Sequence, residues 1–280
     1  MNKIWQTRLA QSEQRLKLKK QKRKKITNYL LCFLLVLSVL NFFYPQFFKR
    51  LIYPFLYGKQ SAEKLEISAH DNFADFPLNT PAFIFERNNM KYKLFPKTKY
   101  SVTGKIGYID YYDGWWNRFY RGFAQGDYIN LVPLDIFMVI GNMAKPEIYD
   151  MFEFDHEERL GIVKCKGVKY KTSFFSFYTS KDEAEKSRHN YAKCNKYINE
   201  EERNNYHPIP ANEKINKALH LLKPGDIVHI EGILVDVPAM GLVTGTRKQQ
   251  HHKYIMGGYN PGMCFILYTT KIIVNNYVYE

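Results

Sequence analysis

The chain has 280 residues, of which 45% are hydrophobic and 24% charged. This composition excludes a wholly disordered chain and a collagen-like or coiled-coil fibre. The formal charge is +14 at pH 7, but residues 1–25 carry +9 of it, so the rest of the chain is only mildly basic. Net charge alone therefore says little about its partners. The 22 Tyr and 20 Phe favour strands and argue against an all-helical fold.

Residues 26–48 predict a single transmembrane helix. They contain no charged side chain, and Leu30–Leu40 is apolar on every face. A hydrocarbon core of about 30 Å needs about 20 helical residues, so this segment is long enough to span. No small-residue cleavage site follows it, which favours an uncleaved anchor over the alternatives of a removed signal peptide or a buried core helix.

Flanking charge predicts the orientation of this helix. Residues 1–25 hold ten basic side chains and one acid, whereas few basic residues follow the span closely. We therefore expect a basic cytoplasmic tail at 1–25, a bacterial inner-membrane location and a periplasmic C-terminal domain. The tail's expected role is to hold the topology and contact anionic lipid, in preference to binding nucleic acid.

Residues 49–81 are expected to form a juxtamembrane segment and linker, with at most one short helix, before a β domain at 82–280. Asn88-Asn89 predicts a hairpin turn. The expected strands are Phe83–Glu86, Lys91–Phe95, Lys99–Tyr111, Ile129–Ile140, Gly161–Thr179, Asp226–Val237 and Cys264–Val274. Helices are expected after the Ser180 capping box and after Asn212, where an apolar stripe ends at Pro224-Gly225.

Three long strands, a helix and two more strands are the order of a five-stranded OB-like β-barrel, in which the helix plugs the barrel between strands three and four. Gly232, in the middle of the fourth long strand, suits the sharp coiling of a small barrel. The predicted fold is therefore mainly β and OB-like, with one or two helices, preceded by one transmembrane helix. A generic β-sandwich or α+β domain is the alternative.

The segment Arg203–Val235, with NNYHPIPANEKI and KPGDIVHIEGILV, and the later GLVTGTR and PGMC resemble a group of bacterial membrane-anchored proteins. That group shows Asn-Asn, a nearby His, Pro-Gly-Asp and a late Cys in this order, and it brings no established activity. The resemblance implies that one recurring domain includes Asn205, His207, Gly225, Asp226, Gly232 and Arg247.

Two long loops carry the candidate binding residues. The first, between Lys99–Tyr111 and Ile129–Ile140, is rich in aromatic residues and arginine, and the second precedes Cys264. Such groups stack on sugars, bases or a partner's side chains, and on an OB barrel these two loops border the ligand face. The predicted binding residues are Trp115, Trp116, Arg118, Arg121, Arg247 and His251. The simpler alternative is that the tryptophans close the end of the barrel.

Catalytic and metal signatures are weak. No P-loop, nucleophile elbow or dinucleotide fingerprint occurs, and His251-His252 lack metal-ligand spacing. Asp110 and Asp113 could form an acid and base pair, although carboxylates beside a loop are normally turn formers. We therefore predict no metal, no cofactor and no catalytic residue, and an enzyme is the less favoured interpretation.

Of the four cysteines, Cys32 lies in the predicted span and three lie in the body of the chain. Three thiols in an oxidising compartment allow one internal disulfide. The third and fifth strands of an OB-like barrel are neighbours, so the predicted pair is Cys165 and Cys264, with Cys194 free.

These observations favour a binding or scaffold module in an envelope-associated assembly of the secretion, conjugation or defence type. The expected partners are membrane lipid and another protein, with a glycan as a further candidate; nucleic acid would become a partner if the domain were cytoplasmic. The alternative function is a membrane-tethered hydrolase acting on envelope glycans.

Overall fold

The computed structural model describes residues 27, 29, 31, 45–61, 64–75, 80–112, 128–157, 160–168, 181–244 and 264–280. None of the helices in these ranges is both long and apolar enough to cross a membrane. Most of the predicted span 26–48 lies outside them, and α2 begins at its end, at Pro45. Contacts divide the chain into two units, residues 1–52 and 53–280.

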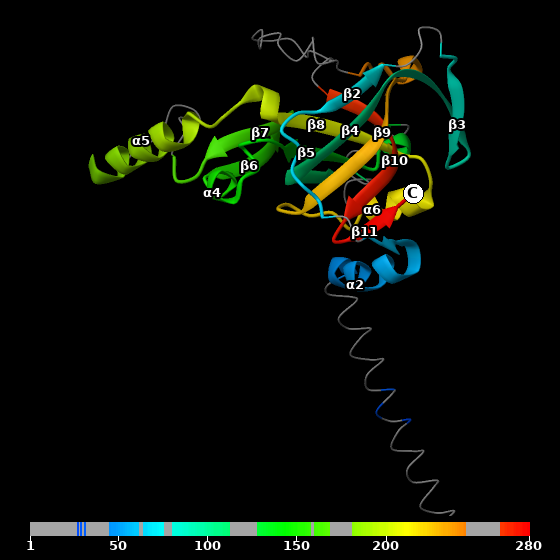
Figure 1. Cartoon of the computed structure of the whole chain (residues 1–280), viewed down its shortest axis with the longest axis horizontal. Coiled ribbons are helices and arrows are strands. Elements are labelled where there is room, and N and C mark those ends of the chain that lie inside the picture. Colours follow the sequence, from blue (N-terminus) through cyan, green and yellow to red (C-terminus); the bar gives the residue numbers. More distant parts are fainter. Residues whose placement is uncertain are drawn as a thin grey trace, which may run out of the picture. The chain divides into compact units, whose positions relative to one another are not determined.

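The second unit is mainly β, as the sequence predicts (Figure 1). Its strands are β1 (Lys59–Gln60), β2 (Asn72–Asp75), β3 (Phe83–Arg87), β4 (Met90–Tyr111), β5 (Leu134–Val139), β6 (Phe152–Glu157), β7 (Leu160–Cys165), β8 (Arg203–Pro210), β9 (Ile227–Asp236), β10 (Cys264–Val274) and β11 (Tyr277–Tyr279). The described helices of the chain are α2 (Pro45–Tyr57), α4 (Pro146–Tyr149), α5 (Lys181–Asn195) and α6 (Glu213–Leu219), with 3₁₀ turns η1 (Glu200–Glu202) and η2 (Pro238–Met240).

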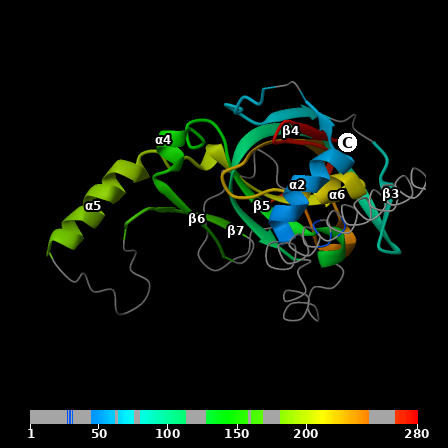
Figure 2. The same cartoon turned by 90° about the horizontal axis from the view of Figure 1, so that it is seen from below.

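Five strands pair in a closed ring, which we call the barrel. Strand β4 pairs with β5, β5 with β8, β8 with β10, β10 with β9, and β9 again with β4. Only the pair β8–β10 is parallel; the other four are antiparallel. Figure 2 shows the long, curved β4 bending around the barrel. Closure leaves these five strands without a free edge between them.

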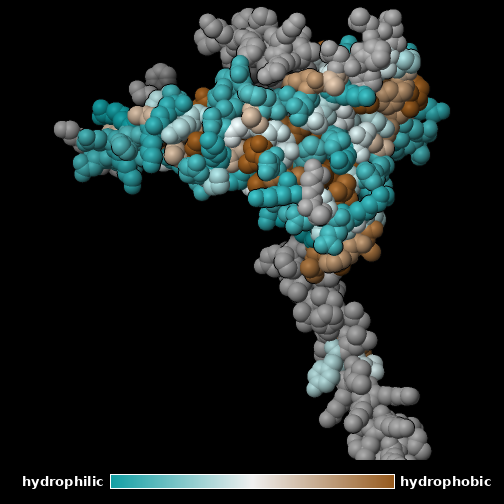
Figure 3. Space-filling model, in the orientation of Figure 1, coloured by the Kyte–Doolittle hydropathy of each residue, from teal (hydrophilic) through white to brown (hydrophobic). Residues whose placement is uncertain are grey.

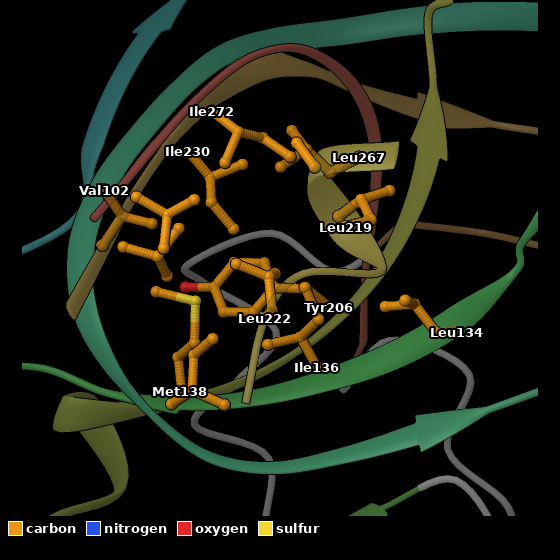
Figure 4. Packing of buried hydrophobic residues seen from close by; sticks show 14 of the residues in the cluster. Val102, Leu134, Ile136, Met138, Tyr206, Leu219, Leu222, Ile230, Leu267 and Ile272 are labelled. Atoms are coloured by element: carbon orange, nitrogen blue, oxygen red, sulfur yellow. The ribbon is translucent and has the colours of Figure 1, made fainter. Parts of the chain in front are cut away.

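The barrel interior is filled by apolar side chains (Figure 4). All five strands contribute, because alternate residues of each strand point inward. Helix α6 adds Ile215, Ala218 and Leu219 to the same core. The side chain of Asn212 caps α6 by accepting a hydrogen bond of 3.0 Å from the backbone N–H of Ile215. The helix predicted after Asn212 is therefore confirmed, and it closes onto the core.

Two predicted local features are also present. Asn88 and Asn89 both have positive φ (51° and 62°) and form the turn between β3 and β4. Gly232 lies between two neighbours, Tyr100 of β4 and Thr269 of β10. A Cβ added at Gly232 would lie 2.2 Å from the carbonyl oxygen of Tyr268. Only a residue without a side chain allows the two strands to approach this closely.

The predicted third barrel strand is wrong. The chain at Gly161 is extended, as expected, but β7 pairs only with β6 in a separate two-stranded sheet. The third barrel strand is instead β8, which is not among the predicted strands and contains Pro208 and Pro210. Strand β5 pairs with β8 only as far as Tyr206, so both prolines lie beyond that pairing, where a missing N–H is tolerated.

The predicted disulfide is wrong for the same reason. Cys165 ends β7, outside the barrel, and it is bonded to Cys194 of α5, with a Cα–Cα distance of 5.8 Å. Cys264 begins β10, where it is buried and takes no part in a disulfide. The pairing inferred from neighbouring barrel strands failed because β7 is not one of them.

The folded unit also begins before residue 82. Within the expected linker 49–81, β1 pairs with β11 and β2 pairs with β4. Helix α2 occupies the start of that segment and exposes Leu51, Phe55 and Leu56. Figure 3 shows an apolar surface over this helix. Much of the predicted linker 49–81 is therefore structured in the described residues.

Candidate functional site

The six predicted binding residues lie outside the described residues. Trp115, Trp116, Arg118 and Arg121 fall in 113–127, and Arg247 and His251 fall in 245–263. Asp113, one of the two carboxylates considered for acid and base chemistry, also lies there. The structure does describe the chain at both ends of each segment. Three of these four ends, Tyr112, Tyr128 and Cys264, belong to a buried polar cluster on the outside of the barrel.

Three side chains of this cluster, Asp135, His207 and Cys264, come from three adjacent strands, β5, β8 and β10. Their neighbours in sequence belong to the core inside the barrel: Ile136, Tyr206 and Phe265. Because successive residues of a strand face opposite sides, Asp135, His207 and Cys264 share the outer face.

Strand register brings the three side chains together. Asp135 and His207 each lie one residue beyond the pair Ile136–Tyr206 of the antiparallel strands β5 and β8. Strand β10 runs parallel to β8 and aligns Cys264 with Asn205, two residues before His207. Residues two apart point to the same face, so the thiol lies diagonally across from the imidazole.

Asp135 and His207 form a buried ion pair. Nδ1 of His207 contacts Oδ1 of Asp135, and the two residues are only 2% and 1% exposed. Such a pair requires further hydrogen bonds to offset the loss of water around both charges. Two tyrosines supply them.

Tyr112 and Tyr128 hydrogen-bond to the carboxylate of Asp135 on the outer face of the barrel. The Tyr112 hydroxyl donates to Oδ2 of Asp135. The Tyr128 hydroxyl lies 3.3 Å from Oδ1 of Asp135 and 3.0 Å from Nδ1 of His207. Both rings are buried in an apolar cluster on this outer face. Tyr112 directly precedes segment 113–127 and Tyr128 directly follows it. Both ends of the first predicted binding loop are therefore anchored by contacts with Asp135.

Cys264 completes the cluster at the other side of His207. The side-chain amide of Asn205 lies 3.5 Å from the Cys264 sulfur. The thiol is also a hydrogen-bonding partner of His207. Because Nδ1 of His207 is occupied by Asp135 and Tyr128, Nε2 is the ring nitrogen left for the thiol. Cys264 directly follows segment 245–263, so the second predicted binding loop ends at this site.

The surroundings of His207 favour its charged form. Burial lowers the pKa of this imidazole, but the carboxylate of Asp135 and the side chain of Cys264 oppose burial and raise the pKa to about 10. At neutral pH the cluster therefore holds an imidazolium between a carboxylate and a thiol.

A second histidine lies on the other side of Asp135. His156 of β6 stacks on Tyr108, with 5.5 Å between ring centroids and 7° between planes. Its Nε2 lies 3.8 Å from Oδ2 of Asp135, and its Nδ1 lies 3.6 Å from Oδ2 of Asp110. Asp110 is thus turned toward His156. Within the ranges that the structure describes, no three His, Cys, Asp or Glu side chains are arranged to hold a metal ion.

The sequence offered partial signals for this cluster. His207 belongs to the motif that carried the resemblance, and Cys264 was noticed but assigned to a disulfide. Asp135 was missed, although it is the one charged residue in the apolar segment INLVPLDIFMVI. A charge inside a buried strand normally requires a partner, and that rule could have identified Asp135.

No family model matches the sequence, and no curated protein or solved structure matches it either.

Proposed function

We propose that the β-rich unit is an OB-like domain that acts as a ligand-binding module on a membrane anchor. The support for the fold is the strand order of the barrel. Numbered along the chain, its strands pair in the cycle one, two, three, five, four, with three and five parallel. Helix α6 lies between strands three and four. These connections support the OB arrangement, which is a five-stranded Greek-key barrel.

On such barrels the ligand lies over strands two and three, between the loops that follow strands one and four. Here these are β5, β8, and segments 113–127 and 245–263. The observation that carries the proposal is that both segments are attached to one outer face, at Asp135 and Cys264. A ligand over this face would contact the predicted binding residues Trp116, Arg118, Arg121, Arg247 and their neighbours.

The proposed location is the bacterial envelope, with residues 26–48 as the anchor and the domain in the periplasm. The Cys165–Cys194 disulfide supports export, because disulfides persist mainly in oxidising compartments. A periplasmic domain would take a protein partner or an envelope glycan, and it would not meet nucleic acid. Membrane lipid would contact the anchor and the basic tail at 1–25.

The test of binding is a pull-down with the full chain in detergent, followed by identification of the co-purifying proteins and by binding assays with solubilised envelope glycans. Trp116→Ala combined with Arg247→Ala should abolish capture, because Trp and Arg dominate the energetics of interfaces. The matched control is Arg188→Ala with Tyr191→Ala on α5, a helix outside the barrel. Equal capture by both double variants would contradict the proposed face.

The test of location is a pair of reporter fusions after Glu280. A reporter active only in the periplasm should score positive, and one active only in the cytoplasm should not. The reverse result would overturn the export proposal and would make nucleic acid a partner to consider.

A further inference from the structure

We infer that Cys264, His207 and Asp135 form a catalytic thiol site that cleaves or transfers the acyl group of an amide or ester. The inference deepens the proposed function and rests on it in one respect: the substrate would be the ligand held over the outer face of β5 and β8. It commits that ligand to a compound with a carbonyl carbon, such as a peptide or a peptide-bearing envelope polymer.

The first argument is the order of the three groups. Asp135 contacts one ring nitrogen of His207, and the thiol of Cys264 partners the other side of the same ring. An acid that orients a histidine, and a histidine that exchanges a proton with a nucleophile, are the defining relationships of nucleophilic triads on unrelated folds. Here three adjacent strands fix the three side chains, which limits their freedom to move apart.

The three side chains differ slightly in exposure. Asp135 is 1% exposed, His207 2% and Cys264 7%. All three side chains are buried, and the thiol is the most exposed of them. A thiol that served only to fill space would be as well placed in apolar surroundings, whereas Cys264 has the amide of Asn205 and the ring of His207 beside it. Burying such polar groups costs free energy that apolar residues of similar size would not.

The positive charge on His207 also bears on the chemistry of the thiol. An imidazolium next to a thiol favours the thiolate, which is the nucleophilic form of cysteine. The carboxylate of Asp135 favours that protonated state of His207.

The proposed reaction is acyl transfer through a thioester on Cys264. The thiolate of Cys264 attacks the carbonyl carbon, and the C–S bond forms as the C–N or C–O bond breaks. The imidazolium of His207 gives its proton to the departing amine or alcohol. Water or a second amine then attacks the thioester, and neutral His207 takes a proton from it. The acyl group leaves as an acid or a new amide, and the ion pair of thiolate and imidazolium is restored.

The test uses the full chain in detergent with Cys32→Ser as background, so that Cys264 is the only cysteine outside the Cys165–Cys194 disulfide. The probe is p-nitrophenyl acetate. We expect rapid release of nitrophenolate and one acetyl group on Cys264, detected by mass spectrometry of the protein. His207→Gln should slow acetylation roughly 100-fold or more, the usual range for loss of an acid–base group.

The matched control is His229→Gln, since His229 lies on β9 and hydrogen-bonds Thr103 and Glu231 instead. It should acetylate at the rate of the background protein. Circular dichroism checks that His207→Gln folds. If it does not, two other measurements test the inference: the acetylation rate of Asp135→Asn, and the rate at which iodoacetamide alkylates Cys264 in the background protein. A thiol no more reactive than the same cysteine in urea would overturn the inference, and so would equal rates in the two histidine variants.

Binding separates this inference from the proposed function. Cys264→Ser should still capture the partner or glycan while losing acetylation. Capture without any thiol reactivity would overturn the catalytic site and leave the binding module intact. Acetylation without any capture would overturn the binding module and retain the thiol chemistry.

Discussion

Gly232 of β9 lies so close to Tyr268 of β10 that the two strands leave no room for a side chain between them. An added Cβ would approach the Tyr268 carbonyl to 2.2 Å, far inside van der Waals contact, and the obstacle is backbone. Beyond Thr269 the register of β10 against β9 shifts. The contact therefore lies next to an irregularity in the pairing of β9 with β10.

We predict that Gly232→Ala destabilises the protein by about 3 kcal/mol, the upper end of the range for overpacking, because β9 must move away from β10. Urea unfolding of the full chain in detergent measures it. The control is Gly225→Ala, which meets no atom within 4 Å but has φ of +88°, so it should cost only about 1–2 kcal/mol of backbone strain. A smaller loss for Gly232→Ala than for this control would contradict the steric account.

The buried imidazolium of His207 predicts a specific dependence of stability on pH. Its pKa in the folded state, about 10, is above the ordinary value of 6.5. The charged ring therefore stabilises the fold fully below pH 6.5, and this contribution is lost as the pH rises toward 10. Melting temperatures measured between pH 6 and pH 10 should fall more steeply for the natural chain than for His207→Gln. Parallel curves would show that His207 is not charged in the folded protein.

The disulfide predicts a loss of stability when it is removed. Cys165 and Cys194 are 29 residues apart, and a loop of that length is worth about 3–4 kcal/mol in the chain-entropy account. Replacing both by serine should lower the free energy of unfolding by that amount. Cys264→Ser is the control for the pairing. Alkylated without reduction, this variant should carry one label fewer than the natural chain, because Cys264 lies outside the disulfide. Labelling of Cys194 in the folded, unreduced chain would refute the pairing.

The cap of α6 gives a smaller prediction. Asn212→Ala removes the side chain that accepts from the N–H of Ile215, which costs about 0.5–2 kcal/mol in comparable helices. Asn212→Asp keeps the acceptor and should be nearly neutral. Urea unfolding distinguishes the two, and equal losses would indicate that the cap contributes nothing here.

Local sequence signals predicted local structure well. The turn at Asn88-Asn89, the cap at Asn212 and the glycine at 232 each depend on neighbours along the chain or on backbone freedom, and all three are present. Pairing across long separations was less predictable. Residues 161–165 have the pattern of a strand, but no periodicity states whether the partner is the barrel or β6.

The candidate site shows the same limit. The sequence around Asp135 does not indicate that His207 or Cys264 lies beside it. The cluster forms only because β5, β8 and β10 are adjacent in the fold. With residues 161–179 predicted as the third barrel strand and no strand predicted at 203–210, His207 has no predicted neighbours in the sheet, and Cys264 is assigned the wrong partner. One misassigned strand therefore hid both the site and the disulfide.

The pairing of β1 with β11 has a consequence for how this domain can be handled. Lys59 and Glu280 form an ion pair of 2.7 Å, so the chain enters the barrel region and leaves it at neighbouring points. Domains whose ends are close together tolerate circular permutation. A short Gly-Ser bridge from residue 280 to residue 59, with new ends opened between 169 and 180, would preserve every strand pair described above. The Cys165–Cys194 bond would then hold the new ends together, giving a permuted form that can be studied apart from the predicted anchor.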